Sequence, residues 1–149
     1  MTHAELVVSA CQWLKRANDV VITDMKSDAS ETPDAIGWKS GVSTLVECKA
    51  SVSDFKADRR KYFRRRVEYG MGVYRYYMTP AGLLSKDDVP ENWGLVEITG
   101  SKYKVKRASC IFRPDNYEEQ RLLTSALRRV CHNAPDGVNV RCYTHRQNT

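Results

Sequence analysis

Apolar positions along the first third of the chain change from the spacing of a helix to the spacing of strands. Over residues 3–16 they recur every three to four positions, which predicts an amphipathic helix. Short β-rich runs at residues 19–25, 33–38 and 42–49 then predict three strands. Ser40-Gly41 separates the last two runs and suits a two-residue hairpin turn.

The rest of the chain repeats this order of elements. Ser51 followed by Asp54 is typical of a helix start, and we expect that helix to run to about Tyr69. Alternating segments then predict three more strands, and apolar spacing predicts a C-terminal helix over about residues 115–132. This order predicts an α/β fold, a single-domain mixed β-sheet flanked by helices, with a core over about residues 3–107. The three strand segments are "VYRYYMT", "GLVEIT" and "YKVKRA".

Length and composition fit a single domain. With 149 residues, of which 42% are apolar, the chain can bury one sizeable core. It contains no apolar run of the length a membrane helix needs and no secretory signal, so we expect a cytoplasmic protein that does not contact the membrane. The small size suggests a homodimer that could hold two strands of a substrate, although no sequence feature defines an interface.

The positive charge is concentrated in one segment. The formal net charge is +6, and "KADRRKYFRRR" holds much of the excess, which favours a polyanionic partner such as nucleic acid. On a helical wheel Arg60, Arg64 and Arg65 lie opposite the apolar side, whereas Arg59 and Arg66 fall within it. A solvated helix face, or a docking surface for an acidic protein, would produce the same pattern. The candidate DNA-binding residues are Arg59, Arg60, Lys61, Arg64, Arg65 and Arg66.

Two carboxylates and a lysine form a candidate catalytic group. If Ser40-Gly41 is the hairpin turn, Asp34 faces Glu47, and Lys49 shares the face of Glu47. Mg²⁺ or Mn²⁺ between the carboxylates would offset their repulsion and activate a water for phosphodiester hydrolysis, while the lysine would hold or deprotonate that water, or stabilise the developing charge. Removing either carboxylate charge should then leave the metal-free protein as stable as the parent or more stable. The competing interpretation is a set of hairpin charges that neutralise one another.

"PD" at Pro33-Asp34 and "ECK" at Glu47–Lys49 resemble the motif of the PD-(D/E)xK nuclease superfamily. The longer series "ECKASVSDFKADRRKY", "VYRYYMTP" and "VPENWGLVEI" resembles the MmcB-like DNA-repair group of that superfamily, over about residues 5–107. The resemblance implies a restriction-endonuclease-like core with a Mg²⁺ or Mn²⁺ site. It also implies two further metal ligands beside Asp34 and Glu47, namely the Cys48 carbonyl and Glu5.

The sequence therefore predicts a metal-dependent nuclease that hydrolyses DNA, with Asp34, Glu47 and Lys49 as catalytic residues and a role in DNA repair or recombination. One alternative is a catalytically silent DNA-binding or partner-inhibiting module on the same fold. Another is a domain that binds only proteins.

Overall fold

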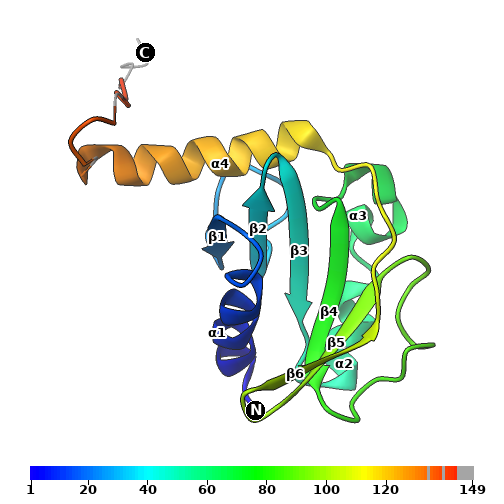
Figure 1. Ribbon diagram of the computed structural model, residues 1–149. Coiled ribbons are helices and arrows are strands. Elements are labelled where there is room, and N and C mark those ends of the chain that lie inside the picture. Colours follow the sequence, from blue (N-terminus) through cyan, green and yellow to red (C-terminus); the bar gives the residue numbers. More distant parts are fainter. Residues whose placement is uncertain (134, 139, 144–149) are drawn as a thin grey trace.

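Six strands form one mixed sheet in the computed structural model, which describes residues 1–133, 135–138 and 140–143 (Figure 1). Each strand pairs with its neighbour in the sequence. The first three strands are antiparallel, the middle pairings β3 to β4 and β4 to β5 are parallel, and β6 returns antiparallel to β5. The strands are β1 Val20–Thr23, β2 Ala35–Lys39, β3 Val42–Cys48, β4 Tyr74–Pro80, β5 Gly94–Thr99 and β6 Lys102–Arg107.

Helices precede, interrupt and follow the strands in the predicted order. The fold is therefore α/β, with a mixed sheet flanked by helices, as the sequence predicts. The α-helices are α1 His3–Leu14, α2 Val52–Asp58, α3 Tyr62–Arg65 and α4 Asn116–Val130, and the 3₁₀ helices are η1 Val67–Tyr69 and η2 Cys131–Asn133.

Each face of the sheet covers its own apolar cluster, because successive strand residues point to opposite sides. On the face that we call the α1 face, Leu6 and Ala10 pack on Val46, Met78 and other strand residues. On the opposite face, the α2 face, Phe55 of α2 packs with a second cluster. That cluster includes Ile36, Leu45, Tyr77, Trp93, Leu95 and Leu122.

The expected helix from Ser51 to about Tyr69 is broken, and the expectation of one continuous helix was wrong. It starts as predicted, since Ser51 Oγ accepts a hydrogen bond from the Asp54 amide, but α2 ends at Asp58 and α3 begins only at Tyr62. The break lets Arg64 turn back and donate to Asp58, a residue six positions earlier. Residues with that separation point to different sides of a straight helix, so the buried ion pair requires the break.

The two ends of the sheet differ in what covers them. α4 crosses the end toward which β2 points, while α1 begins near the other end (Figure 1). At the end that α4 crosses, Glu119 of α4 attaches the helix to the sheet. Its carboxylate accepts hydrogen bonds from Trp38 Nε1, Ser43 Oγ and the Gly72 amide. At the opposite end of the sheet, where β3 finishes, Glu47 and Cys48 are the last residues of the strand.

Within the part of the chain that the structure describes, no helix is both long enough and apolar enough to cross a bilayer.

Candidate functional site

Asp34 lies directly before β2, beside the end of β3. The predicted register is confirmed, because Ala35 pairs with Val46 and Lys39 with Val42 around the Ser40-Gly41 turn. The Cys48 amide donates a 2.8 Å hydrogen bond to Asp34 Oδ2, so the carboxylate is held at the end of the hairpin where β3 finishes.

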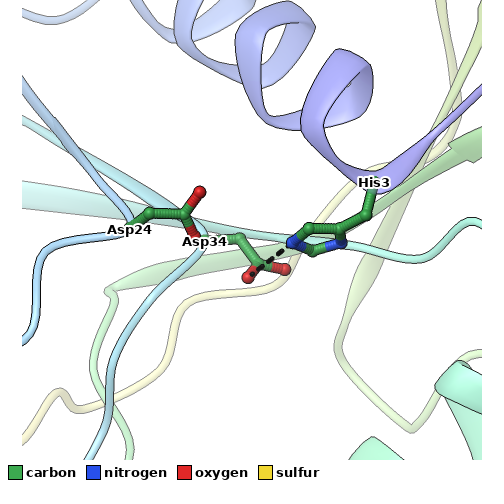
Figure 2. Close-up of side chains that lie close together, drawn as sticks. All are labelled: His3, Asp24 and Asp34. Atoms are coloured by element: carbon green, nitrogen blue, oxygen red, sulfur yellow. Dashed lines mark ion pairs between the residues drawn. The ribbon is translucent and has the colours of Figure 1, made fainter.

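Asp34 lies close to two groups that could share a metal ion with it. His3, in the first turn of α1, places Nε2 3.4 Å from Asp34 Oδ1. Asp24 follows β1, and its amide donates to the Asp34 carbonyl at 3.2 Å. One potential ligand atom from each of the three residues lies within 4.8 Å of the others (Figure 2). Carboxylate oxygens and an imidazole nitrogen are ligand types that divalent transition metals accept.

The environment of Asp34 disfavours its charge in the absence of a metal. Burial, followed by repulsion from Glu47, raises the pKa of the Asp34 carboxyl to about 6, although the Cys48 amide, Lys49 and His3 oppose that shift. A cation bound to Asp34 would reverse this penalty, because an opposite charge favours the ionised form.

Glu5 does not join this group. Its Oε2 accepts a hydrogen bond from the Thr2 amide, and its own amide donates to Thr2 Oγ1 at 3.2 Å, which completes a capping box at the start of α1. Among the described residues, His3 is the side chain of α1 that lies with Asp34 in the potential metal-binding group. The Cys48 side chain is buried, and Cys48 contributes to the lining of the adjacent cleft.

Glu47 points into the α2 face, where two cations hold it. Its Oε1 lies 3.0 Å from Arg64 Nη2, an ion pair whose angle is too poor for a hydrogen bond, and its Oε2 lies 3.4 Å from Lys49 Nζ. The predicted proximity of Glu47 and Lys49 is therefore confirmed. The expectation that loss of the Glu47 charge would relieve repulsion is not supported, because the carboxylate already has buried partners of opposite charge.

Arg64 links three carboxylates in a buried ionic cluster. Its guanidinium contacts Glu31 Oε1 at 2.6 Å and Asp58 Oδ2 at 2.9 Å, in addition to Glu47. Glu31 also accepts a 3.0 Å hydrogen bond from the Met71 amide. We call Glu31, Glu47, Lys49, Asp58 and Arg64 the ionic cluster.

Asp58 connects the ionic cluster to the surface. Lys49 Nζ lies 3.3 Å from Asp58 Oδ1, and the more exposed Lys61 Nζ lies 2.8 Å from the same oxygen. Burial alone would raise the pKa of Asp58, but Arg64 and Lys49 hold it well below its ordinary value. Burial also opposes the charge of Lys49, yet Glu47 and Asp58 raise the pKa of this lysine overall, so the ammonium stays protonated.

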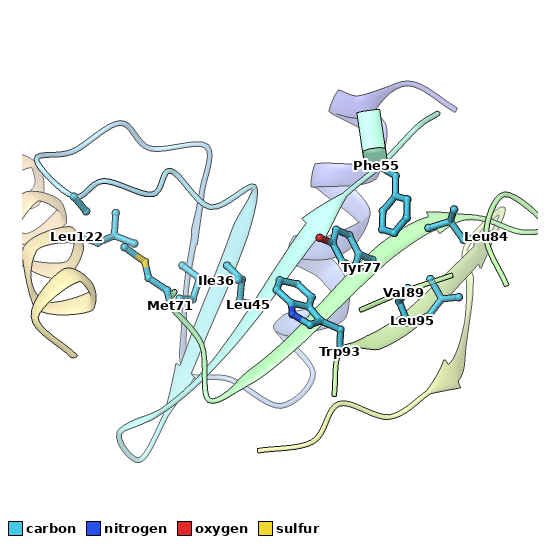
Figure 3. Close-up of a cluster of buried hydrophobic side chains, with 11 residues drawn as sticks. Ile36, Leu45, Phe55, Met71, Tyr77, Leu84, Val89, Trp93, Leu95 and Leu122 are labelled. Atoms are coloured by element: carbon cyan, nitrogen blue, oxygen red, sulfur yellow. The ribbon is translucent and has the colours of Figure 1, made fainter. Parts of the chain in front are cut away.

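Aromatic side chains of the α2 face contact the ionic cluster, and Figure 3 shows three of them, Phe55, Tyr77 and Trp93, within the apolar cluster of that face. Tyr77 donates a 2.6 Å hydrogen bond to Asp58 Oδ2. Its ring stacks on Trp93 at 4.6 Å and meets the edge of Phe55 at 5.0 Å. Arg64 lies 4.8 Å from the Trp93 ring. Few water molecules can reach such a site, and its charges therefore interact more strongly than they would at the surface.

A cleft of about 370 Å³ opens where these two groups of residues meet. His3 and Cys48 line it together with Lys49, Asp58 and Lys61, and its remaining lining residues are Asp54 and Ala57. It lies at the carboxyl end of β3, a strand that pairs in parallel with β4, and the carboxyl ends of parallel strands are a common place for ligands in α/β sheets. The cleft brings the Asp34 side of the hairpin and the ionic cluster to one opening.

The predicted DNA-binding residues divide into exposed and buried positions. Arg59, Arg60 and Arg65 are exposed, and so are Lys61 and Arg66. Arg64 is an exception: the expectation that it faces solvent was wrong, because its side chain is 2% exposed and engaged in the ionic cluster. The break between α2 and α3 invalidates the helical wheel on which that expectation rested.

Sequence reasoning missed three residues that shape this region. His3 and Glu31 gave no usable signal, because one lies in a first helical turn and the other in a polar, turn-like segment. Tyr77 falls on a predicted strand, but its hydrogen bond to Asp58 could not be predicted from the sequence.

Comparisons with known proteins identify the fold and no function. No protein-family model matches the sequence, and no curated protein matches it. The SPO1766 protein of unknown function from Silicibacter pomeroyi has a similar structure, with a TM-score of 0.65 and 17% sequence identity over 94% of this chain and 97% of that chain. This similarity shows a shared α/β fold. The resemblance to PD-(D/E)xK nucleases stays a prediction from the sequence.

Proposed function

We propose that the protein is a divalent-metal-dependent nuclease that hydrolyses phosphodiester bonds in DNA. The main support is the arrangement at the end of β3, where Asp34 lies beside the cleft and Lys49 lines it between Glu47 and Asp58. The sequence resemblance supports the same reaction and suggests a role in DNA repair or recombination.

The donor set at Asp34 fits a metal ion. Asp24 and Asp34 supply the hard oxygens that Mg²⁺ and Mn²⁺ prefer, and the His3 imidazole makes the set better suited to Mn²⁺. When bound, such an ion would polarise the phosphate and lower the pKa of a water molecule. Glu47 and the Cys48 carbonyl are the further ligands that the resemblance implies, while Glu5 serves its helix cap.

Lys49 would stabilise the negative charge that develops on the phosphate. Its ammonium is held between Glu47 and Asp58 and is therefore already oriented before substrate arrives. Asp58 and Arg64 act as positioning residues, since one holds Lys49 and the other holds Glu47. Lys61 lies at the mouth of the cleft, where it could contact a substrate phosphate.

The experiment is a cleavage assay on labelled DNA with Mn²⁺ or Mg²⁺, combined with thermal melting at increasing metal concentrations. The parent should cleave DNA and melt at higher temperature with Mn²⁺, whereas Asp34→Asn should lose both effects. Asp24→Asn and His3→Ala should weaken the thermal shift. Glu5→Gln is the matched control, because glutamine preserves the capping box, and it should behave as the parent does. If the parent neither cleaves DNA nor responds to metal, the proposal is wrong.

One observation favours a second candidate function, a catalytically silent DNA-binding module. Arg64 and Lys49 neutralise Glu47 without a metal ion, so the buried carboxylate does not require one for its charge. DNA binding that is unaffected by Asp34→Asn, in a protein without cleavage activity, would support this alternative.

A further inference from the structure

Two tyrosines form an exposed stack on the basic segment. The rings of Tyr62 and Tyr69 lie 5.4 Å apart with an angle of 26° between their planes. Tyr62 is 56% exposed and Tyr69 is 44% exposed, and neither belongs to the apolar cluster on either face of the sheet. The pair therefore contributes little to the core, and each ring retains accessible surface.

Exposed cations surround this stack. Arg66 Cζ lies 5.6 Å from the centre of the Tyr69 ring and also pairs with Glu68 at 2.7 Å. That pairing offsets the negative charge of Glu68, the residue that precedes Tyr69 in the sequence. The exposed cations of the same segment are Arg59, Arg60, Lys61, Arg65 and Arg66.

The stack also adjoins the cleft. Lys61 is the N-cap of α3, so it directly precedes Tyr62, and its own side chain lines the cleft and forms an ion pair with Asp58. A chain of phosphates that follows the basic segment past Tyr62 would thus approach Lys49 and the end of β3.

We infer that Tyr62 and Tyr69 bind unpaired bases of single-stranded DNA whose phosphates contact the surrounding cations. Aromatic rings among cations suit single strands, because unpaired bases expose their flat faces, whereas a duplex hides them. An acidic protein would pair with the cations but would have no comparable use for the stacked rings. The choice of DNA as the polymer rests on the proposed nuclease function. The inference adds that the substrate of this nuclease contains single-stranded DNA.

The test measures binding without cleavage. Fluorescence anisotropy in EDTA compares a labelled thymidine oligonucleotide, a DNA duplex of equal length and a uridine oligonucleotide. The parent should bind the thymidine strand most tightly. Tyr62→Ala and Tyr69→Ala should each weaken that binding by about 5- to 150-fold, the measured range for loss of one stacked base, and should leave duplex affinity nearly unchanged.

Two controls separate stacking from unfolding and from charge. Tyr62→Phe and Tyr69→Phe keep the rings and should retain tight binding, while Tyr117→Ala removes a tyrosine of α4 that is 68% exposed and should have no effect. Equal losses on duplex and single strand, no loss in either alanine variant, or tighter binding of the uridine strand would each overturn the inference. These binding measurements need no metal. If the protein binds the thymidine strand as expected but does not cleave DNA in the cleavage assay, the nuclease proposal is wrong and the inference about Tyr62 and Tyr69 still holds.

Discussion

Glu47 and Arg64 form a buried ion pair in which Glu47 Oε1 lies 3.0 Å from Arg64 Nη2 and each side chain is 2% exposed. The residues come from different elements, β3 and α3, so their pairing fixes how the segment after α2 folds against the sheet. The same arginine that the sequence assigns to a DNA-binding face is thereby withdrawn from the surface. Neighbouring residues of one basic segment consequently have different roles.

Replacing Arg64 should destabilise the protein far more than replacing Arg65. Arg64→Met would leave Glu31, Glu47 and Asp58 close together without their shared cation, and loss of one partner from a buried ion pair costs about 3–5 kcal/mol. Arg65→Ala changes an exposed side chain and should cost less than about 0.5 kcal/mol. Urea unfolding compares the two variants, and similar free energies of unfolding would show that the ion pairs of Arg64 do not stabilise the fold.

Asp34→Asn and Glu47→Gln should change stability in opposite directions when no metal is present. Since the Asp34 carboxylate is ionised at a cost, Asp34→Asn should raise the free energy of unfolding at pH 7 by up to roughly 3 kcal/mol, the equivalent of a pKa raised from 3.8 to about 6. Glu47→Gln removes a partner of Arg64 and Lys49 and should lower it by about 3 kcal/mol.

The pH dependence of the Asp34→Asn effect follows from the direction of that pKa shift. A raised folded pKa means that the folded parent binds more protons than the unfolded chain between about pH 4 and pH 6, so its stability falls as pH rises through this range. Parent and variant should be equally stable near pH 3.5 and should diverge up to about pH 6. Urea unfolding in EDTA at several pH values measures the difference, and a gap that is constant with pH would contradict this account.

Asp58→Asn should show the opposite pH dependence. Arg64 and Lys49 hold the pKa of Asp58 below its unfolded value, so the stabilisation is complete above about pH 4 and is lost as pH falls toward the folded pKa. The variant should be less stable than the parent by about 3 kcal/mol at pH 7, with a smaller difference at pH 2.5. Asp87→Asn, at an exposed position, is the control and should show little difference at either pH.

The sequence was sufficient to predict elements whose signals are local. Alternation and turn chemistry identified six strands and the register of the β2–β3 hairpin, because Ser40-Gly41 determines which residues pair. That register correctly placed Asp34 beside the end of β3. Alternation along β3 also predicted that Lys49 shares the face of Glu47, and the two charged groups lie 3.4 Å apart.

The sequence was insufficient where long-range ion pairs decide the structure. The segment from Ser51 to Tyr69 has the composition of one helix, yet the pairing of Arg64 with Asp58 and Glu47 divides it. Glu31 contacts Arg64 across 33 positions of the chain, a separation that no local pattern reports. The proximity of His3 to Asp34 likewise depends on how α1 packs, so the potential ligand set could be recognised only in three dimensions.

Exposed cations of the basic segment should contribute to DNA binding by pairing with phosphates. Arg60→Ala and Arg65→Ala should each lower the slope of log affinity against log salt by about 0.9 on duplex DNA, or about 0.7 on a single strand, for each phosphate that the variant no longer neutralises. They should weaken all sequences alike, because phosphates carry no sequence information. Lys102→Ala changes an exposed lysine of β6 and is the charge-matched control. If the slope does not change in either arginine variant, the basic segment does not bind the phosphates.

Lys49→Ala should slow the chemical step of the proposed nuclease while leaving metal binding intact. Lys49 is not in the His3–Asp24–Asp34 group, so the Mn²⁺-dependent rise in melting temperature should persist, whereas single-turnover cleavage should fall by at least about 100-fold, as for loss of one group that stabilises transition-state charge. Lys61→Ala is the comparison, because Lys61 forms an ion pair with the same Asp58 oxygen from the mouth of the cleft. It should raise KM more than it lowers kcat. Ca²⁺ should support DNA binding but little cleavage by the parent, since its longer and more variable coordination positions water poorly. Cleavage by Lys49→Ala at the rate of the parent would exclude this lysine from the reaction.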